Sequence, residues 1–95
     1  MSRNRLDGKV AIVTGAGMGM GAATARVFAG YGAKVIVSDI NEAAGLETLE
    51  SIRETGGTAD FILCDVAEDD QVEALVSKTV ATFGRLDAAV NNAAI

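Results

Sequence analysis

The feature that most constrains the fold is a run of alternating glycines that follows directly on a short apolar segment. Four glycines occupy alternate positions of residues 15–21, after the apolar run 10–13 and before the alanine-rich run 22–28. A buried strand, a glycine turn and a helix start in that order predict a cradle for phosphate. Missing side chains let a pyrophosphate approach the backbone, and the first helical turn offers free N–H groups and a partial positive charge. The alternative is a tight turn without a ligand, which the density of glycines disfavours.

The spacing of these glycines excludes two common phosphate-binding patterns. No Gly-Lys-Ser or Gly-Lys-Thr follows the turn, which excludes a P-loop. The pattern G-x-G-x-x-G would need a glycine at position 20, where the chain has Met20. The sequence fits Thr-Gly-x-x-x-Gly-x-Gly instead, beginning at Thr14 and using Gly15, Gly19 and Gly21.

Strand-like and helix-like segments alternate along the whole chain. Four strands are predicted from apolar runs, at residues 10–13, 34–38, 59–64 and 86–90. Three helices are predicted between them, at about 20–31, from Asn41 to Gly56, and from about residue 70 to Phe83. This β-α-β-α-β-α-β order predicts an α/β fold, a Rossmann-type doubly wound parallel sheet with strand order 3-2-1-4. Its ligand crevice is expected where the order reverses, between the first and fourth strands.

Two of the predicted helices carry apolar residues at helical spacing, which predicts the faces that they bury. The helix after Asn41 is expected to bury Ala43, Leu46, Leu49 and Ile52, and to be weakened by Gly45. The last helix is expected to bury Val72, Leu75, Val76, Val80 and Phe83.

An acidic residue, Asp39, ends the second predicted strand, 18 positions after Gly21. A carboxylate there can accept hydrogen bonds from both hydroxyls of an adenosine ribose. It would also repel the 2′-phosphate of NADP, and neither Met18 nor Ile40 supplies a cation to hold that phosphate. The position therefore predicts a preference for NAD over NADP. The alternative is a solvated or helix-capping carboxylate.

Polar residues also follow the third and fourth predicted strands. Asp65 can accept a hydrogen bond from an adenine amino group, with the backbone of Val66 beside the ring, or it can simply cap the next helix. Asn91 and Asn92 can bridge loop backbones or touch the ribose. Both interpretations stay open for each pair.

Composition excludes several classes of function. A net charge of −5 and a pI near 4.5 argue against nucleic acid as a partner. The chain has one cysteine, Cys64, and no histidine, so we do not expect a metal site. Cys64 is predicted to be a buried strand residue. The apolar run at residues 10–13 is too short for a signal peptide or a membrane helix, so we expect a cytoplasmic protein without a membrane partner.

Taken together, these motifs resemble the short-chain dehydrogenase/reductase family, of the classical type. The resemblance covers nearly the whole chain and rests on residues 8–15, the turn through Gly21, Asp39, the pair Asp65-Val66 and residues 91–94. The family's Asn-Asn-Ala-Gly motif reads Asn-Asn-Ala-Ala here, which would slightly crowd the backbone beside the cofactor.

The resemblance implies an NAD-dependent oxidoreductase that moves a hydride between an alcohol or ketone substrate and nicotinamide. It further implies a homo-oligomer at full length. It assigns dinucleotide binding to a set of positions in the strand-end loops: Gly15, Gly17, Met18, Gly19, Met20, Gly21, Asp39, Ile40, Asp65, Val66, Asn92 and Ala93.

The catalytic residues of that family have no counterpart in this chain. The family uses a serine and a Tyr-x-x-x-Lys pair, all downstream of the Asn-Asn-Ala motif. The one tyrosine, Tyr31, ends a predicted helix, and Lys34 follows it by three positions rather than four. Residues 1–95 are therefore interpreted as the NAD-binding Rossmann half of a single domain without its C-terminal catalytic part. We expect this chain alone to be inactive.

Two other functions share part of this pattern. A non-catalytic dinucleotide-binding or sensing module would carry the same motifs. A methyltransferase that uses S-adenosylmethionine also pairs a glycine loop with an acidic strand end. Such an enzyme usually has an acidic residue just before its glycines, where this chain has Thr14.

Overall fold

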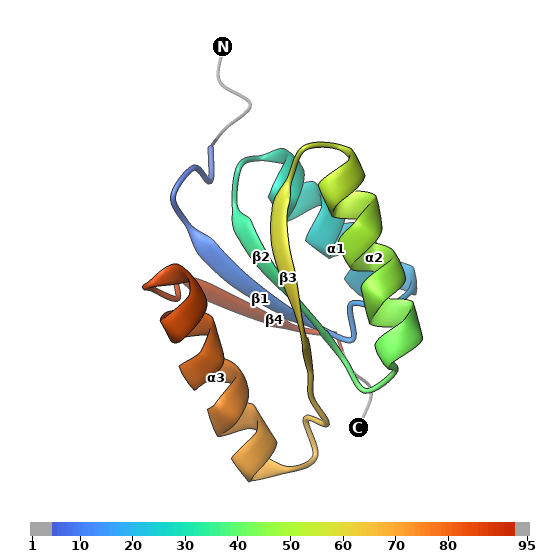
Figure 1. Cartoon of the computed structure of the whole chain (residues 1–95), viewed down its shortest axis with the longest axis vertical. Helices are drawn as coiled ribbons and strands as arrows, with labels where there is room; N and C mark the ends of the chain where they lie inside the picture. The colour runs from blue at the N-terminus through green and yellow to red at the C-terminus, as the bar shows by residue number, and fades with distance from the viewer. Residues whose placement is uncertain (1–4, 93–95) are drawn as a thin grey trace.

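The computed structural model describes residues 5–92, which form four strands and three helices in strict alternation (Figure 1). The elements are β1 (Val10–Thr14), α1 (Gly19–Gly30), β2 (Lys34–Asp39), α2 (Glu42–Glu54), β3 (Thr58–Leu63), α3 (Asp69–Phe83) and β4 (Ala88–Asn91). All strand pairs are parallel, and the sheet order is β3-β2-β1-β4. The predicted fold class and topology are confirmed, with element ends that differ from the predicted ones by one or two residues at most of the boundaries.

The register of the strands brings their carboxyl ends to one edge of the sheet. Thr14 at the end of β1 lies opposite Asn91 at the end of β4. On the other side, Asp39 at the end of β2 lies opposite Leu63 at the end of β3. The glycine turn and the loops after β2, β3 and β4 therefore start from the same end of the sheet, which is where open α/β sheets bind ligands.

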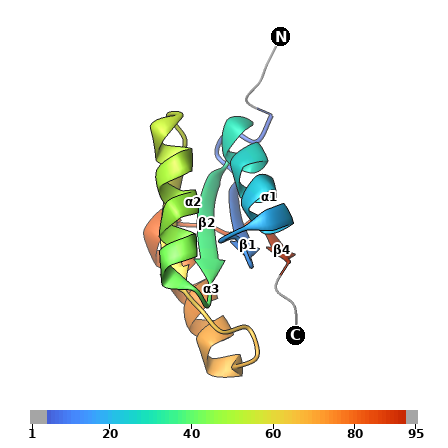
Figure 2. The same cartoon turned by 90° about the vertical axis from the view of Figure 1, so that its right-hand side faces the viewer.

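Helices cover both faces of the sheet (Figures 1 and 2). Helices α1 and α2 lie on one face and α3 lies on the other. Alternate residues of the central strands therefore enter two separate cores, because successive strand side chains point to opposite faces. Val13, Val35 and Val37 pack toward α1 and α2. Ile12 and Ile36 pack toward α3. Burial on both faces explains why β1 is apolar from Val10 to Val13 and why the middle of β2, Val35 to Val37, is apolar without interruption.

The expected buried face of α2 is partly wrong. Ala43 and Leu46 are exposed, whereas Leu49 and Ile52 are buried as expected, together with Gly45 and Thr48. The cause is a close approach of α2 to β3. A Cβ at Gly45 would overlap the ring of Phe61, so the helix turns its smallest residue toward the strand. Gly45 is thus a packing residue, which periodicity alone does not reveal.

The expected buried face of α3 is also partly wrong. Leu75 is buried, Val72 and Phe83 are half-buried, and Val76 and Val80 are exposed. Thr79 is buried in their place and donates to its own helix, to the Leu75 carbonyl oxygen at 2.7 Å. Val76 borders an open groove between α3 and the β1–β4 pair, so part of the apolar stripe stays exposed within residues 5–92.

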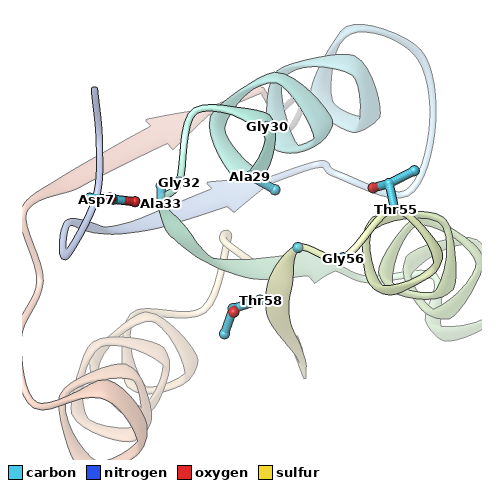
Figure 3. Close-up of a pocket in the computed structure, with 9 residues that line it drawn as sticks. Asp7, Ala29, Gly30, Gly32, Ala33, Thr55, Gly56 and Thr58 are labelled. Carbon is cyan, nitrogen blue, oxygen red and sulfur yellow. The ribbon is translucent and has the colours of Figure 1, made fainter. Parts of the chain in front are cut away.

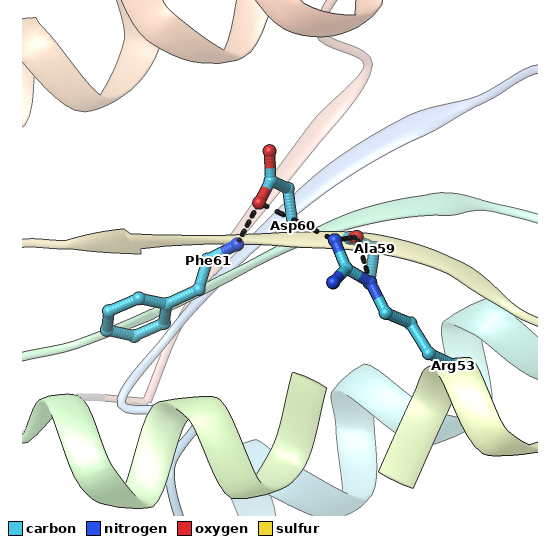
Figure 4. A network of polar contacts seen from close by, with 4 residues as sticks. All are labelled: Arg53, Ala59, Asp60 and Phe61. Carbon is cyan, nitrogen blue, oxygen red and sulfur yellow. Dashed lines mark hydrogen bonds and ion pairs between the residues drawn. The ribbon is translucent and has the colours of Figure 1, made fainter. Parts of the chain in front are cut away.

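The two outer strands of the sheet, β3 and β4, differ in whether side chains bind the backbone groups on their free edges. On β3, the Arg53 guanidinium donates to the Ala59 carbonyl oxygen from Nη2 at 3.0 Å and lies 3.8 Å from the Asp60 carboxylate (Figure 4). The Asp60 carboxylate accepts from the Phe61 N–H at 2.9 Å. Side chains thus occupy edge groups that another strand would otherwise pair with. Strand β4 is short and mostly exposed, and pairs only with β1 within residues 5–92.

No helix within residues 5–92 has the length and apolar character needed to cross a membrane. Within the same residues, no group of three or more His, Cys, Asp or Glu side chains is arranged to hold a metal ion.

Candidate functional site

A cleft of about 350 Å³ opens at the carboxyl end of the sheet. It is lined by residues from the glycine turn and from the loops after β2, β3 and β4: Gly15, Met18, Asp39, Ile40, Cys64, Asp65, Val66 and Asn92. All of these except Cys64 are among the positions that the sequence assigned to dinucleotide binding. Residues far apart in the chain therefore meet at the carboxyl end of the sheet, in a cleft that spans the ends of all four strands and is not confined to the expected position between β1 and β4. Ala93 lies outside the described residues.

The glycine turn depends on glycine for two different physical reasons. Gly15 and Gly19 have φ angles of 62° and 60°, in the left-handed region that strongly favours glycine. Gly21 is buried at the start of α1, where a Cβ would overlap the carbonyl oxygen of Gly15. The chain at Gly15 and the first turn of α1 are thus in backbone contact, which holds the loop in a tight curve.

Helix α1 presents an uncapped N-terminus to this region. Met18 is the N-cap residue and makes no side-chain cap hydrogen bond, and the first turn has no acidic residue. The Ala22 N–H bonds back to the Met18 carbonyl oxygen at 3.3 Å. The N–H groups before it have no partner inside the helix, as at any helix start, and the helix dipole makes this end positive. The arrangement suits an anion such as a pyrophosphate.

Asp39 makes two hydrogen bonds to backbone groups at the wall of the cleft. One oxygen, Oδ2, accepts from the Gly17 N–H at 2.8 Å, and the other, Oδ1, accepts from the Asn41 N–H at 2.9 Å. An ionised carboxylate offers about four acceptor positions, so each oxygen can still accept a further hydrogen bond. The local structural role and a ribose-binding role are therefore compatible at this residue.

Asp65 shapes the loop after β3 without capping the next helix. Its Oδ1 accepts from the Ala67 N–H at 3.0 Å, and its own N–H donates to Gln71 Oε1 at 2.8 Å. The N-cap of α3 is Glu68, so the alternative in which Asp65 is a simple N-cap is wrong. With Val66, Asp65 borders the cleft beside Ile40.

Asn91 and Asn92 connect the end of β4 to Thr14, just before the glycine turn, through hydrogen bonds. The Thr14 hydroxyl donates to Asn91 Oδ1 at 2.8 Å, and the Asn92 N–H donates to the Thr14 carbonyl oxygen at 3.3 Å. Asn91 therefore has a structural role, whereas Asn92 also lines the cleft. These contacts hold the end of β4 beside Gly15.

Two residues at the site were not identified from the sequence. Cys64 forms part of the cleft wall, and burial raises the pKa of its thiol, with a further increase from the negative charge of Asp65 and a smaller opposing effect of the Ser38 hydroxyl. The thiol is thus protonated at neutral pH and serves as an apolar surface. Thr48 of α2 is buried and donates to the Gly17 carbonyl oxygen at 3.3 Å. In the sequence, Thr48 could have been noticed as a polar residue within the apolar stripe of α2.

A second hollow, of about 370 Å³, lies at the amino end of the sheet (Figure 3). Its wall contains Asp7 and a set of small residues from the end of α1, the turns before β2 and β3, and the first residue of β3: Ala29, Gly30, Gly32, Ala33, Thr55, Gly56, Gly57 and Thr58. Helices α1 and α2 end here, so the negative ends of two helix dipoles face it along with a carboxylate. This hollow disfavours anions.

Comparisons with known proteins identify the family to which the chain is similar. The sequence profile of the family described as short chain dehydrogenase matches residues 9–95. An uncharacterized oxidoreductase of Thermotoga maritima is 56% identical over 89 residues, which cover 94% of this chain and 35% of that protein. A short chain dehydrogenase/reductase of Aspergillus oryzae is 52% identical over 91 residues, covering 95% of this chain and 35% of that protein.

Solved structures give the same result. The crystal structure of a hydroxysteroid dehydrogenase from Escherichia coli superposes with a TM-score of 0.93 at 42% identity, covering 98% of this chain and 40% of that one. A short chain dehydrogenase from Mycobacterium smegmatis gives a TM-score of 0.92 at 41% identity, covering 99% of this chain and 40% of that one. The chain thus spans about 35–40% of the length of these relatives.

Proposed function

The chain belongs to the short chain dehydrogenase family, and on that premise we propose that it forms the dinucleotide-binding part of an oxidoreductase that prefers NAD to NADP. The observation that carries the preference is the Asp39 carboxylate, which lines the cleft and is held by the N–H groups of Gly17 and Asn41. A carboxylate fixed in this way can accept from the ribose hydroxyls and repels a 2′-phosphate.

Different parts of the cleft and of the adjacent start of α1 would each bind one part of a dinucleotide. The start of α1, with Gly19, Met20 and Gly21, would bind the pyrophosphate through backbone N–H groups. Gly15, Gly17 and Met18 would lie beside the adenosine ribose that Asp39 binds. Ile40 and Val66 offer apolar contact for the adenine ring, and Asp65 offers an acceptor for its amino group. Asn92, after β4, would lie toward the nicotinamide ribose, and Ala93 stays a candidate for dinucleotide binding on the sequence alone.

The nicotinamide ring supplies the hydride chemistry when the dinucleotide is bound. The residues of this chain bind and orient that dinucleotide, and none is assigned a catalytic role. We propose that residues 1–95 are one half of a single domain, and that the whole protein acts on an alcohol or ketone as a homo-oligomer. Residues of the remaining part would then supply proton transfer to the substrate oxygen.

Calorimetric titration of the chain with NADH and NADPH tests the proposal. We expect NADH to bind at least about tenfold more tightly, because a 2′-phosphate beside a fixed carboxylate costs more than the 1.4 kcal/mol that a tenfold ratio represents. In the variant Asp39→Asn, which keeps the size of the side chain and removes its charge, this ratio should fall toward one. S-adenosylmethionine serves as the control ligand and should not bind.

Equal affinity for NADH and NADPH in the unaltered chain would contradict the stated preference. Tight binding of S-adenosylmethionine without binding of either nicotinamide dinucleotide would overturn the proposed function itself.

A further inference from the structure

Helix α2 contacts the glycine turn through a buried hydroxyl. Thr48 is 1% exposed, and its Oγ1 donates to the Gly17 carbonyl oxygen at 3.3 Å. Buried helix threonines commonly donate to a carbonyl of their own helix four residues earlier, as Thr79 does in α3. Thr48 makes its hydrogen bond to the loop instead, which links α2 to the turn.

Gly17 is fixed on both sides by this arrangement. Its N–H donates to Asp39 Oδ2 at 2.8 Å, while its carbonyl oxygen accepts from Thr48. A Cβ at Gly17 would lie 2.8 Å from the Cβ of Ala44, so α2 also packs closely against this residue. The two peptide groups that flank Gly17 are therefore both held, one by a carboxylate at the end of β2 and one by α2.

These contacts belong to a set of hydrogen bonds that join the turn, the end of β2 and helix α2, with the backbone of α2 completing the connection between Ala44 and Thr48. Asp39 accepts from the Asn41 N–H at 2.9 Å, and the Asn41 side chain accepts from the Ala44 N–H at 3.0 Å to cap α2. Thr48, one helical turn further along α2, returns to Gly17. The position of Asp39, the start of α2 and the conformation of the turn thus depend on one another.

The direction of the Thr48 contact also orients the other end of the peptide group between Gly17 and Met18, the Met18 N–H. In a planar trans peptide the C=O and N–H bonds point in opposite directions. Because the Gly17 carbonyl points toward Thr48, the N–H of the following residue, Met18, points away from α2. Met18 borders the cleft and is the N-cap of the helix whose first turn suits a phosphate.

We propose that Thr48 is a positioning residue of the phosphate-binding turn, acting through the Gly17 carbonyl without touching the dinucleotide. The inference rests on the proposed function. Removal of the hydroxyl frees one peptide group of the turn and leaves a buried carbonyl without its donor. The turn should then lose part of its preorganised shape, and the dinucleotide must restore that shape on binding.

The test compares Thr48→Val with a matched variant, Thr79→Val. Both substitutions remove a hydroxyl from a buried threonine in the middle of a helix, but Thr79 lies on the opposite face of the sheet and makes no hydrogen bond to the turn. We expect Thr48→Val to weaken NADH binding by about threefold to tenfold, the factor expected for one net hydrogen bond. Thr79→Val should change it by less than about twofold, and Thr48→Ser, which retains the hydroxyl, should restore it.

Amide hydrogen exchange without ligand gives a second measurement, because the Gly17 N–H is protected by Asp39 only while the turn keeps its shape. Exchange at Gly17 should accelerate in Thr48→Val and stay unchanged in Thr79→Val. Equal exchange at Gly17 in the two variants would overturn the role of Thr48, whether or not NADH binds. Failure of the unaltered chain to bind NADH, together with faster exchange in Thr48→Val, would overturn the proposed function and leave the loop-positioning role supported.

Discussion

The two ends of the sheet can be compared directly. At the carboxyl end, a cleft of about 350 Å³ borders Gly15 and Met18, where α1 begins. At the amino end, a hollow of about 370 Å³ borders Gly30 and Gly56, close to where α1 and α2 finish. Both ends contain glycines with positive φ angles and glycines in close contact with neighbouring atoms.

The difference between the two ends lies in helix polarity and in the fixed charges. The cleft receives the positive start of α1, whereas the hollow receives the negative ends of two helices and the Asp7 carboxylate. Glycine content and size therefore do not identify a phosphate site. The direction in which the helices run, set by the β-α order of the chain, decides which end can accept a pyrophosphate.

The largest effect is expected from Gly21→Ala at the carboxyl end. The added Cβ would overlap the Gly15 carbonyl oxygen, so the turn must move away from α1. Overpacking of this kind costs about 2 kcal/mol, which corresponds to about thirtyfold in affinity. We expect NADH binding, measured by calorimetry, to weaken by at least that factor.

The matched control for Gly21→Ala is Gly30→Ala at the other end of the same helix. A Cβ at Gly30 would meet no atom within 4 Å, and Gly30 is not among the glycines with positive φ. The NADH affinity of the Gly30→Ala variant should equal that of the unaltered chain, and its thermal stability should be unchanged or slightly higher. An equal loss of affinity in both variants would show that the turn at Gly21 has no special part in binding.

A smaller effect, confined to stability, is expected from Gly56→Ala at the amino end. Gly56 has a φ of 86°, so alanine is strained there by about 1–2 kcal/mol although its Cβ would meet open space. Thermal unfolding should therefore occur at a lower temperature, while NADH affinity below the transition stays within about twofold. A large loss of NADH affinity would mean that the amino end of the sheet affects binding at the carboxyl end, contrary to the separate roles proposed for the two ends.

The sequence predicted the topology well because β1 and β2 are apolar on both faces and the helices have clear ends. It also predicted which loops line the cleft, since parallel strands place their carboxyl ends together. The faces of α2 and α3 were predicted less well. The contact of Gly45 with Phe61 rotates α2, and the open groove beside Val76 leaves α3 partly uncovered. Neither fact follows from apolar periodicity.

The hydrogen bonds that hold the site residues in place could not be predicted from the sequence either. The position of Asp39 predicted a carboxylate at the crevice, but its hydrogen bonds to Gly17 and Asn41 depend on the path of the turn. Thr48 stands 31 positions from Gly17, so their hydrogen bond depends on how α2 packs on the sheet. Residues that touch a ligand can follow a local motif, whereas residues that hold such a motif in place need the tertiary structure.

The most direct test of the account uses the backbone amides of the glycines as reporters in an NMR titration with NADH. We predict that the signals of Gly15, Gly17, Gly19 and Gly21 shift as NADH binds, while those of Gly30, Gly32, Gly56 and Gly57 stay in place. Shifts at the amino-end glycines, with none at the turn after β1, would contradict it.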